Sequence, residues 1–445
     1  MSFPRYPAYK DSGVEWIGEV PKHWPLPPLY LRYEVLLGKM LDAKRQTGTK
    51  SLPYLRNVDV QWDRVNTQDL PQMDVDSTEL ERFTLLDGDL LVCEGGEVGR
   101  TAIWRDEGVV CAFQKAIHRV RPLSSIEEPR FLFHCMQHAS SQGAFIANGN
   151  PNTIPHLTGE AFRLYRFPRP PVAEQRVIAA FLDRETAKID ALVAEQRRLM
   201  DVLKEKRQAV ISHAVTRGLN ADVSTQASGV EWLGDVPSHW TVTRLGNVFR
   251  EVAEAGTDEL PILSVSIHHG VSDKEIDEEA LERKVSRSDD RSMYKRVSPG
   301  DLVYNMMRAW QGGFGTVTVY GMVSPAYVVA RPRSRIITAY VEHLLRTPQA
   351  IEQMRRHSRG VTDFRLRLYW DEFKNIRITL PPESESVAIC NAIAKMDRQF
   401  DELSLSCDQA IDLLLTRRSA LISEAITGQI DVRGLTTPSP SDPVK

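Results

Sequence analysis

Residues 173–216 contain neither proline nor glycine, and this constrains the fold more than any other feature of the chain. Alanine, glutamate, glutamine, lysine, arginine and leucine predominate there, and these residues are strong helix formers. Pro170 and Pro171 precede the stretch, where a fixed φ and a missing N–H suit the start of a helix. Gly218 follows it, as a glycine commonly does where a helix ends. The sequence therefore predicts one long helix within residues 169–218.

A second stretch of the same kind lies 211 residues further along, after Pro381 and Pro382, and predicts a second long helix within residues 380–430. In both stretches apolar or long-stemmed side chains recur at alternating steps of three and four, the heptad pattern of a helix that packs against another helix. The predicted seam consists of Ile189, Leu192, Gln196, Leu199, Leu203, Lys206 and Val210 in the first helix and of Phe400, Leu403, Cys407, Ala410, Leu414, Arg417 and Leu421 in the second.

A short motif shows that the repeat extends beyond the helices. Ser-Gly-Val-Glu-Trp-Ile-Gly opens the first strap (residues 12–24), and Ser-Gly-Val-Glu-Trp-Leu-Gly opens the second strap (residues 228–240). Two tryptophans, two glycines and a proline in each predict a rigid, non-helical segment. We favour a structural clasp at the start of each domain over a strap that binds a partner. The straps and the helices together indicate an internal duplication.

The regions between the straps and the helices combine short alternating apolar runs with turn residues, a pattern typical of strands joined by tight turns. Gly88-Asp89 and Gly300-Asp301 are matching turns, whereas the loops that follow them differ in sequence. We therefore expect an α+β protein with two mixed α/β domains, which with their straps occupy residues 1–168 and 219–379. Residues 431–445 are expected to form a disordered tail.

The short connection between the first helix and the second strap constrains how the helices can run. They are expected to form an antiparallel coiled coil, with one mixed domain near each end and a pseudo-two-fold axis between them. At 1.5 Å per residue, each helix would measure about 65 Å.

Composition excludes several broad classes of protein. The net charge is −3, so the chain is not a general polyanion binder, although charge can be segregated onto one face. The first ten residues lack an apolar run, and no run approaches the roughly 18 residues that span a bilayer. We therefore expect a cytoplasmic protein without a signal peptide or a membrane contact. The 5 cysteines lack any CxxC spacing and are expected to be reduced, mostly buried thiols.

A search for catalytic motifs finds none. There is no GxxxxGK[ST] phosphate loop, no GxSxG or HExxH motif, and no signature tetrapeptide of amino-methyltransferases. His134 and His138 lie four residues apart with Cys135 between them, but nothing nearby completes the four ligands of a closed zinc site. Ordinary packing is the favoured interpretation of this group and of the pair His268-His269. We expect no catalytic residue and no metal site in this chain.

The straps, the Gly-Asp-Leu turn, the Pro-Pro pair with Glu174-Gln175 at the start of the first helix, and the repetition of these features resemble the specificity subunits of type I restriction-modification systems. The resemblance covers about residues 9–434. It is weaker after Pro381-Pro382, where Glu-Ser-Glu-Ser at residues 383–386 stands in place of Glu174-Gln175.

The resemblance implies a non-catalytic, sequence-specific DNA-binding subunit. Each mixed region would be a target recognition domain for one half of a bipartite site in double-stranded DNA, and the helices would set the gap between the halves. The chain would dock two modification (methyltransferase) subunits and, through them, restriction (motor-nuclease) subunits. S-adenosylmethionine, ATP and magnesium would be cofactors of those partners, with none in this chain. Two alternatives stay open: a scaffold that joins two proteins without binding DNA, and a fused nuclease or methyltransferase with an unrecognised site.

Base reading requires side chains with paired donors and acceptors, such as arginine for guanine and asparagine or glutamine for adenine. By residue type and loop position, the candidates in the first mixed region are Arg56, Asn57, Gln114, Lys115, Asn150 and Asn152. In the second they are Asn305, Arg308, Gln311, Tyr327, Arg365 and Arg367. For each of them a solvated surface position or a structural hydrogen bond is the competing interpretation.

Overall fold

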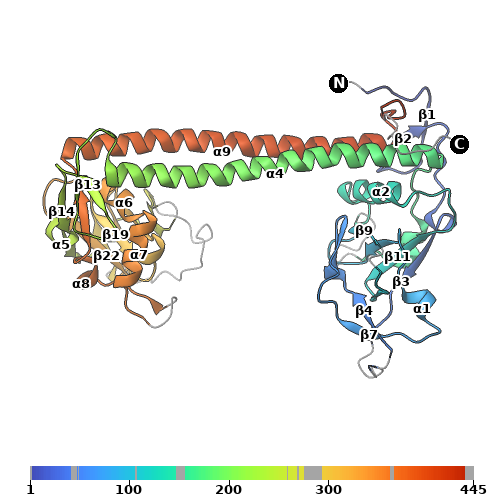
Figure 1. The fold of residues 1–445 in the computed structure, drawn as a ribbon, viewed down its shortest axis with the longest axis horizontal. Coiled ribbons are helices and arrows are strands. Elements are labelled where there is room, and N and C mark those ends of the chain that lie inside the picture. Colours follow the sequence, from blue (N-terminus) through green and yellow to red (C-terminus); the bar gives the residue numbers. More distant parts are fainter. Residues whose placement is uncertain are drawn as a thin grey trace. The chain divides into compact units, whose positions relative to one another are not determined.

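The computed structural model describes residues 3–41, 48, 50–105, 108–146, 156–257, 259–267, 270–274, 293–360 and 365–435 (Figure 1). The chain divides into two compact units. Unit 1 comprises Met1–Gln196 and Gln409–Lys445, and unit 2 comprises Arg197–Asp408. Each long helix contributes to both units, so neither helix is a domain by itself. Within the described ranges, no helix is long and apolar enough to cross a membrane.

The main sheet of unit 1 has four antiparallel strands in the order β3-β11-β8-β9. They are Tyr33–Leu37 (β3), Ile117–Pro122 (β11), Leu90–Cys93 (β8) and Thr101–Ile103 (β9). Every residue of β8 is buried, as expected for a central strand covered on both faces. Helix α2 (Pro129–Ser141) packs against β9, and a core that includes Leu91 and Phe113 lies within this unit.

Shorter elements complete unit 1. A second sheet has the order β10-β4-β7, formed by Ala112–Phe113, Ser51–Leu55 and Gln72–Asp74. Two strand pairs are β1 (Tyr9–Asp11) with β2 (Glu19–Pro21) and β5 (Val60–Gln61) with β6 (Arg64–Val65). The short helices are η1 (Leu29–Leu31), η3 (Asn57–Asp59), α1 (Leu80–Phe83) and α3 (Gly159–Leu164).

Unit 2 repeats the main sheet with the equivalent order β15-β22-β19-β20. Its strands are Phe249–Val252 (β15), Tyr327–Pro332 (β22), Leu302–Asn305 (β19) and Phe314–Thr316 (β20). Helix α6 (Thr338–Leu345) packs against β20 as α2 packs against β9. The other helices are α5 (Leu245–Val248), η6 (Ala309–Gln311), α7 (Pro348–His357) and α8 (Trp370–Phe373). Two strand pairs are β12 (Thr225–Ala227) with β13 (Asp235–Pro237) and β14 (Thr241–Arg244) with β23 (Arg377–Leu380). Two more are β16 (Val265–Ser266) with β17 (Gly270–Val271) and β18 (Lys295–Val297) with β21 (Gly321–Val323).

The two Gly-Asp turns have the same structure in both units. The glycines of Gly88-Asp89 and Gly300-Asp301 have φ of +87° and +92°, a left-handed conformation that favours glycine. The first aspartate accepts two hydrogen bonds of 2.7 Å from Arg121, and the second accepts two of 3.0 Å from Arg331. Each pair joins the start of the central strand to its neighbour, so the predicted duplication is confirmed in topology and in side-chain contacts.

The long helices are α4 (Val172–Arg217) and α9 (Glu383–Ile426), which lie side by side in Figure 1. In unit 1, Arg418 Nε donates to Asp190 Oδ1 at 2.9 Å. In unit 2, Arg207 donates to Asp397 at 2.8 Å and to Asp401 at 3.1 Å. Earlier residues of α4 therefore pair with later residues of α9, and the predicted antiparallel pairing is confirmed.

The predicted seam is wrong at five positions, where the side chains are exposed: Leu192, Leu199, Lys206, Leu403 and Arg417. Leu192, Leu199 and Leu403 are 51%, 43% and 51% exposed, whereas Val193 and Ile411 are 6% and 8% exposed. The observed seam comprises Ile189, Val193, Gln196, Met200, Leu203, Arg207, Val210 and Ala214 in α4 and Phe400, Ser404, Cys407, Ile411, Leu414, Arg418, Leu421 and Ala425 in α9. Lys206 and Arg417 are also exposed, and Ala410 is half-buried. The predicted and the observed positions both recur at steps of three and four. The predicted series contains more leucines, and for that reason the sequence pointed to the flank of the helix pair instead of the seam.

The first strap is a clasp on the start of α4. The buried carboxylate of Glu174 accepts hydrogen bonds from Tyr6 Oη at 2.6 Å and Trp24 Nε1 at 3.3 Å, and lies 3.1 Å from His23 Nε2. Trp24 is fully buried. These contacts fix the strap against the helix end and support the structural interpretation of the motif.

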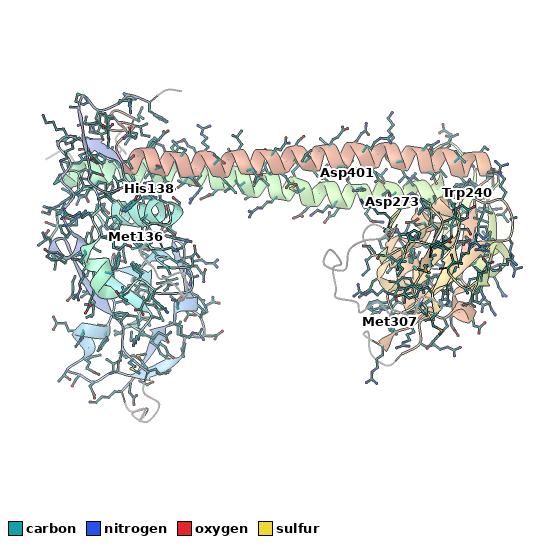
Figure 2. All side chains as sticks on the ribbon, turned by 180° about the vertical axis from the view of Figure 1, so that it is seen from behind. Met136, His138, Trp240, Asp273, Met307 and Asp401 are labelled. Atoms are coloured by element: carbon teal, nitrogen blue, oxygen red, sulfur yellow. The ribbon has the colours of Figure 1, made fainter. Side chains whose placement is uncertain are left out.

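The second strap holds α9 in the same way. Glu385 accepts a hydrogen bond from Trp240 Nε1 at 3.1 Å, and its carboxylate lies 2.7 Å from His239 Nε2. Figure 2 labels Trp240 beside the helices of unit 2. Glu385 follows Glu174 by the same 211 residues, so the repeat is better preserved at residues 383–386 than the sequence analysis suggests.

The change at this helix start is the replacement of Gln175 by Ser386. Gln175 Nε2 donates to Pro170 O at 2.8 Å, and Ser386 Oγ donates to Pro381 O at 3.4 Å. Both side chains thus reach the carbonyl of the first proline in their Pro-Pro pair.

Candidate nucleic-acid interface

A close backbone approach in unit 2 brings together arginines that lie several residues apart. Arg359 and Arg367 form a β-bridge in which each N–H donates to the other carbonyl at 2.9 Å. A Cβ on Gly360 would lie 2.6 Å from the carbonyl oxygen of Arg365, so this approach requires glycine. The bridge fixes the backbone that carries the three arginines.

These arginines line an open surface cavity of about 800 Å³, which we call the basic cavity. Its lining residues are Arg359, Gly360, Arg365, Arg367, Tyr369, Asp371 and Glu372. Glu372 pairs with Arg359, and Asp371 pairs with Lys374 at 2.6 Å. Guanidinium donors match phosphate oxygens and the acceptor edge of guanine. The exposed ring of Tyr369 adds a face on which a base or sugar could pack.

The other candidates of unit 2 gather at the end of the central strand. Asn305, the last residue of β19, lies opposite Tyr327 in the sheet. Burial raises the pKa of Tyr327, and the nearby positive charge of Arg308 opposes that rise. Asn305 Oδ1 accepts a hydrogen bond from Met307 N at 2.9 Å and so shapes the loop, in which Gln311 is exposed.

This loop is joined to the basic cavity. Leu368 N, one residue after Arg367, donates to Met306 O at 2.9 Å. The structure therefore brings the unit 2 candidates into one region. In Figure 2, Trp240 lies next to the long helices, and Met307 lies on the opposite side of unit 2.

In unit 1 the contacts of Arg56 and Asn57 favour structural hydrogen bonds over base reading. Arg56 donates to the carboxylate of Asp59 through Nε and Nη2, both at 2.8 Å. Asn57 Nδ2 donates to Gly95 O at 3.1 Å, while Asn57 Oδ1 accepts from Arg100 Nη2 at 2.9 Å. An amide occupied on both sides cannot also pair with an adenine edge without breaking these bonds.

Gln114 and Lys115 lie at an unusual turn. Ala116, the next residue, has φ of +107°, a conformation that non-glycine residues rarely adopt. Its carbonyl accepts hydrogen bonds from Glu94 N at 2.9 Å and Asn57 Nδ2 at 3.3 Å, which hold the turn in place. Lys115 is exposed and Gln114 is half-buried. Strained turns of this kind cluster at binding sites, so both residues stay predicted contacts. Asn150 and Asn152 lie outside the described residues.

The histidines of α2 belong to the packing of unit 1. His134 Nε2 lies 2.8 Å from the Asp183 carboxylate of α4, to which Arg130 Nε also donates at 2.7 Å. Burial tends to raise the pKa of Asp183, but these two partners outweigh it and lower the pKa. His138, labelled in Figure 2, packs its ring 5.6 Å from that of Trp16 in the first strap. Among the described residues, no group of three or more His, Cys, Asp or Glu side chains has metal-binding geometry.

Of the seven lining residues only Arg365 and Arg367 are sequence-based candidates, and the side chains of Arg359 and Tyr369 are the further ones that could contact DNA. Arg359 belongs to an arginine-rich run, which could have marked it as a candidate. Only the β-bridge to Arg367 shows that these two residues lie opposite each other. A spacing of eight residues does not by itself predict such a pairing.

The sequence is similar to that of known specificity subunits. A family model described as "Type I restriction modification DNA specificity domain" matches residues 34–198. The chain is 25% identical over 366 residues to the type I restriction enzyme EcoBI specificity subunit of Escherichia coli, covering 79% of this chain and 75% of that protein. It is 21% identical over 439 residues to the Escherichia coli EcoKI specificity subunit, covering 93% and 90%.

Solved structures share the fold. The HsdS subunit from Thermoanaerobacter tengcongensis is 18% identical, with a TM-score of 0.53 over 92% of this chain and 98% of that one. A chain from a structural study of complex assembly in a type I restriction-modification system is 17% identical, with a TM-score of 0.62 and the same coverage of 92% and 98%. In its matched specificity domain, its repeated sheet and its paired helices, the chain is therefore similar to the specificity subunits of type I restriction-modification systems.

Proposed function

We propose that this chain is the sequence-specific DNA-recognition subunit of a type I restriction-modification complex, and that each mixed domain reads one half of a bipartite target. The observation that carries the proposal is a duplicated scaffold with unlike loops. The sheets have the same strand order, yet the loop after the central strand contains Gly95 and Gly96 in unit 1 and Met307 and Arg308 in unit 2. Two readers of different sequences need this combination, because half-sites are read by loops on a common frame.

The basic cavity supports DNA as the ligand of unit 2. Three of its seven lining residues are arginines and two are acidic, each acidic side chain being paired with a basic one, whereas the chain as a whole carries a net charge of −3. Local concentration of guanidinium groups on a chain of nearly neutral charge indicates a specific anionic ligand instead of general polyanion binding.

We further propose that the long helices set the gap and dock two modification subunits, through which restriction subunits join. The helices expose leucines on their flanks, and exposed apolar side chains on paired helices are typical of a surface that packs against further helices. We expect those partner subunits to bind S-adenosylmethionine, ATP and magnesium and to carry out the catalysis.

Footprinting of the complex reconstituted with modification subunits tests the function. We expect two protected segments separated by a fixed gap at moderate salt. Absence of a footprint at every salt concentration would favour the non-DNA-binding scaffold. Methylation or cleavage of DNA by the purified chain alone would favour the fused enzyme.

Replacement of Arg365 or Arg367 by alanine is expected to weaken binding to one half-site by about 1–3 kcal/mol, because each would remove a charge-assisted contact to a base or phosphate. Binding to fragments altered in one half-site at a time provides the measurement. Arg335→Ala is the matched control, since this guanidinium of unit 2 is 86% exposed and lies outside the basic cavity. Equal losses at both half-sites would contradict the assignment of unit 2 to one half.

Replacement of Leu199 and Leu403 by glutamate is expected to weaken capture of modification subunits roughly 10-fold or more while leaving the fold intact. Both side chains belong to unit 2 and are about half exposed, so a charge there costs little folding energy but would be buried in a docked complex. Co-purification with tagged modification subunits is the measurement, and Ala209→Glu, at another exposed position of α4, is the control. Unchanged capture by the double variant would rule out this docking surface.

A further inference from the structure

The duplication allows positions in the two units to be matched by hydrogen bonds. In unit 2, Leu368 N donates to Met306 O, the first residue after β19, at 2.9 Å. In unit 1, Leu157 N donates to Glu94 O, the first residue after β8, at 2.8 Å. An equivalent backbone hydrogen bond in each unit therefore joins the leucine to the loop that follows the central strand.

The match continues on both sides of this bond. Phe162 and Phe373, five residues after each leucine, are buried to within 1% exposure. The residue that precedes Leu157 is His156, and the residue that precedes Leu368 is Arg367. His156 therefore occupies in unit 1 the position that Arg367 occupies at the basic cavity of unit 2.

The ring of His156 lies beside a loop that is anchored by a hydrogen bond. The side chain is exposed, but its Nδ1 and Cε1 atoms lie only 3.0 Å and 3.2 Å from where a Cβ on Gly95 would be. The carbonyl of Gly95 accepts a hydrogen bond from Asn57 Nδ2 at 3.1 Å, which anchors the loop. Glycine at position 95 therefore leaves room for the Nδ1–Cε1 edge of the imidazole beside an anchored backbone.

We propose that His156 contacts DNA in the half-site read by unit 1 and helps to determine its sequence, as the counterpart of Arg367; this inference rests on the proposed function. A neutral imidazole offers one donor and one acceptor, whereas a guanidinium offers five donors and no acceptor. The same backbone position therefore presents different hydrogen-bonding groups in the two domains. This difference is what a split target with unlike halves requires.

Asn57 acts in this arrangement as a positioning residue. Its amide holds Gly95, and through Gly95 the loop on which the His156 ring lies.

The test is selection of bound fragments from a random double-stranded DNA pool by the complex reconstituted with modification subunits. With His156→Ala we expect weakened preference at positions of one half-site, with the gap and the other half-site unchanged, and binding about 5- to 100-fold weaker on the wild-type target. Arg367→Ala should affect the other half-site. His156→Arg should restore binding with a different preferred base, and His213→Ala, at an exposed position of α4, should change nothing.

A second variant tests the geometry without removing the imidazole. Gly95→Ala places a methyl group against the ring and should weaken the same half-site positions as His156→Ala. An unchanged selected sequence and an affinity within twofold of wild type for His156→Ala would overturn the inference, as would an effect of His156→Ala and Arg367→Ala on the same half-site. If the wild-type complex selects no bipartite sequence, the proposed function fails with the inference, and no variant is needed to see it.

Discussion

Deletion of one heptad from each long helix, residues 193–199 of α4 and residues 408–414 of α9, is expected to shorten the gap between the half-sites by about three base pairs. Seven residues of helix measure about 10.5 Å, and successive base pairs are about 3.4 Å apart. The Asp190–Arg418 and Arg207–Asp401 pairs place these two segments opposite each other, so removal of both preserves the seam. The loops of both mixed domains are untouched, and the half-site sequences should not change.

Selection from a random DNA pool measures the gap and the half-sites together. Deletion from α4 alone is the control, because it shifts the seam and should destabilise the helix pair instead of shortening the gap. New half-site sequences with the original gap would contradict the idea that the helices act as a ruler.

Replacement of Glu127 by alanine is expected to lower the free energy of unfolding by about 3–5 kcal/mol, because it leaves a buried charge without its partner. The side chains of Arg32 and Glu127 are both 0% exposed, and Arg32 donates to Glu127 Oε2 through Nε at 3.0 Å and Nη2 at 2.7 Å. Arg169 Nε also lies 2.7 Å from the same carboxylate. Urea denaturation followed by circular dichroism is the measurement.

Unit 2 supplies the control for this prediction. Leu29 N donates to Tyr165 O, and Leu245 N donates to Ile376 O, both at 2.9 Å, so Arg32 corresponds to Val248, which is 5% exposed. An apolar residue therefore fills this position in the second domain. The double variant Arg32→Leu, Glu127→Leu should recover much of the lost stability, since a buried ion pair can often be replaced by packed apolar groups. A loss below about 1 kcal/mol for Glu127→Ala alone would contradict this account.

The two long helices and the internal duplication were predictable because local sequence patterns, which do not depend on tertiary contacts, indicate them. Two proline pairs that precede glycine-free stretches, a glycine after the first helix and two similar straps are visible in the sequence, and each corresponds to an observed element. The seam shows the limit of such patterns. Val193 and Leu192 both fit a heptad, and only packing against the opposite helix decides which of them is buried.

The candidate site was less predictable because residue type does not reveal which partner satisfies a polar group. Asn57 has the side chain of an adenine reader, yet its amide is used by Gly95 and Arg100. His156 carries no motif. The 211-residue offset of the repeat matches it to Arg367, and one backbone hydrogen bond in each domain supports that match. The offset does not show what surrounds either side chain, and the closeness of His156 to Gly95 is visible only in the structure.

Sequencing of the DNA that the wild-type complex, reconstituted with its modification subunits, selects from a random pool tests the central claim most directly. The account predicts two unlike half-sites at a constant separation, each assigned to one mixed domain by the effect of His156→Ala or Arg367→Ala. A single uninterrupted consensus, or no consensus at all, would contradict it.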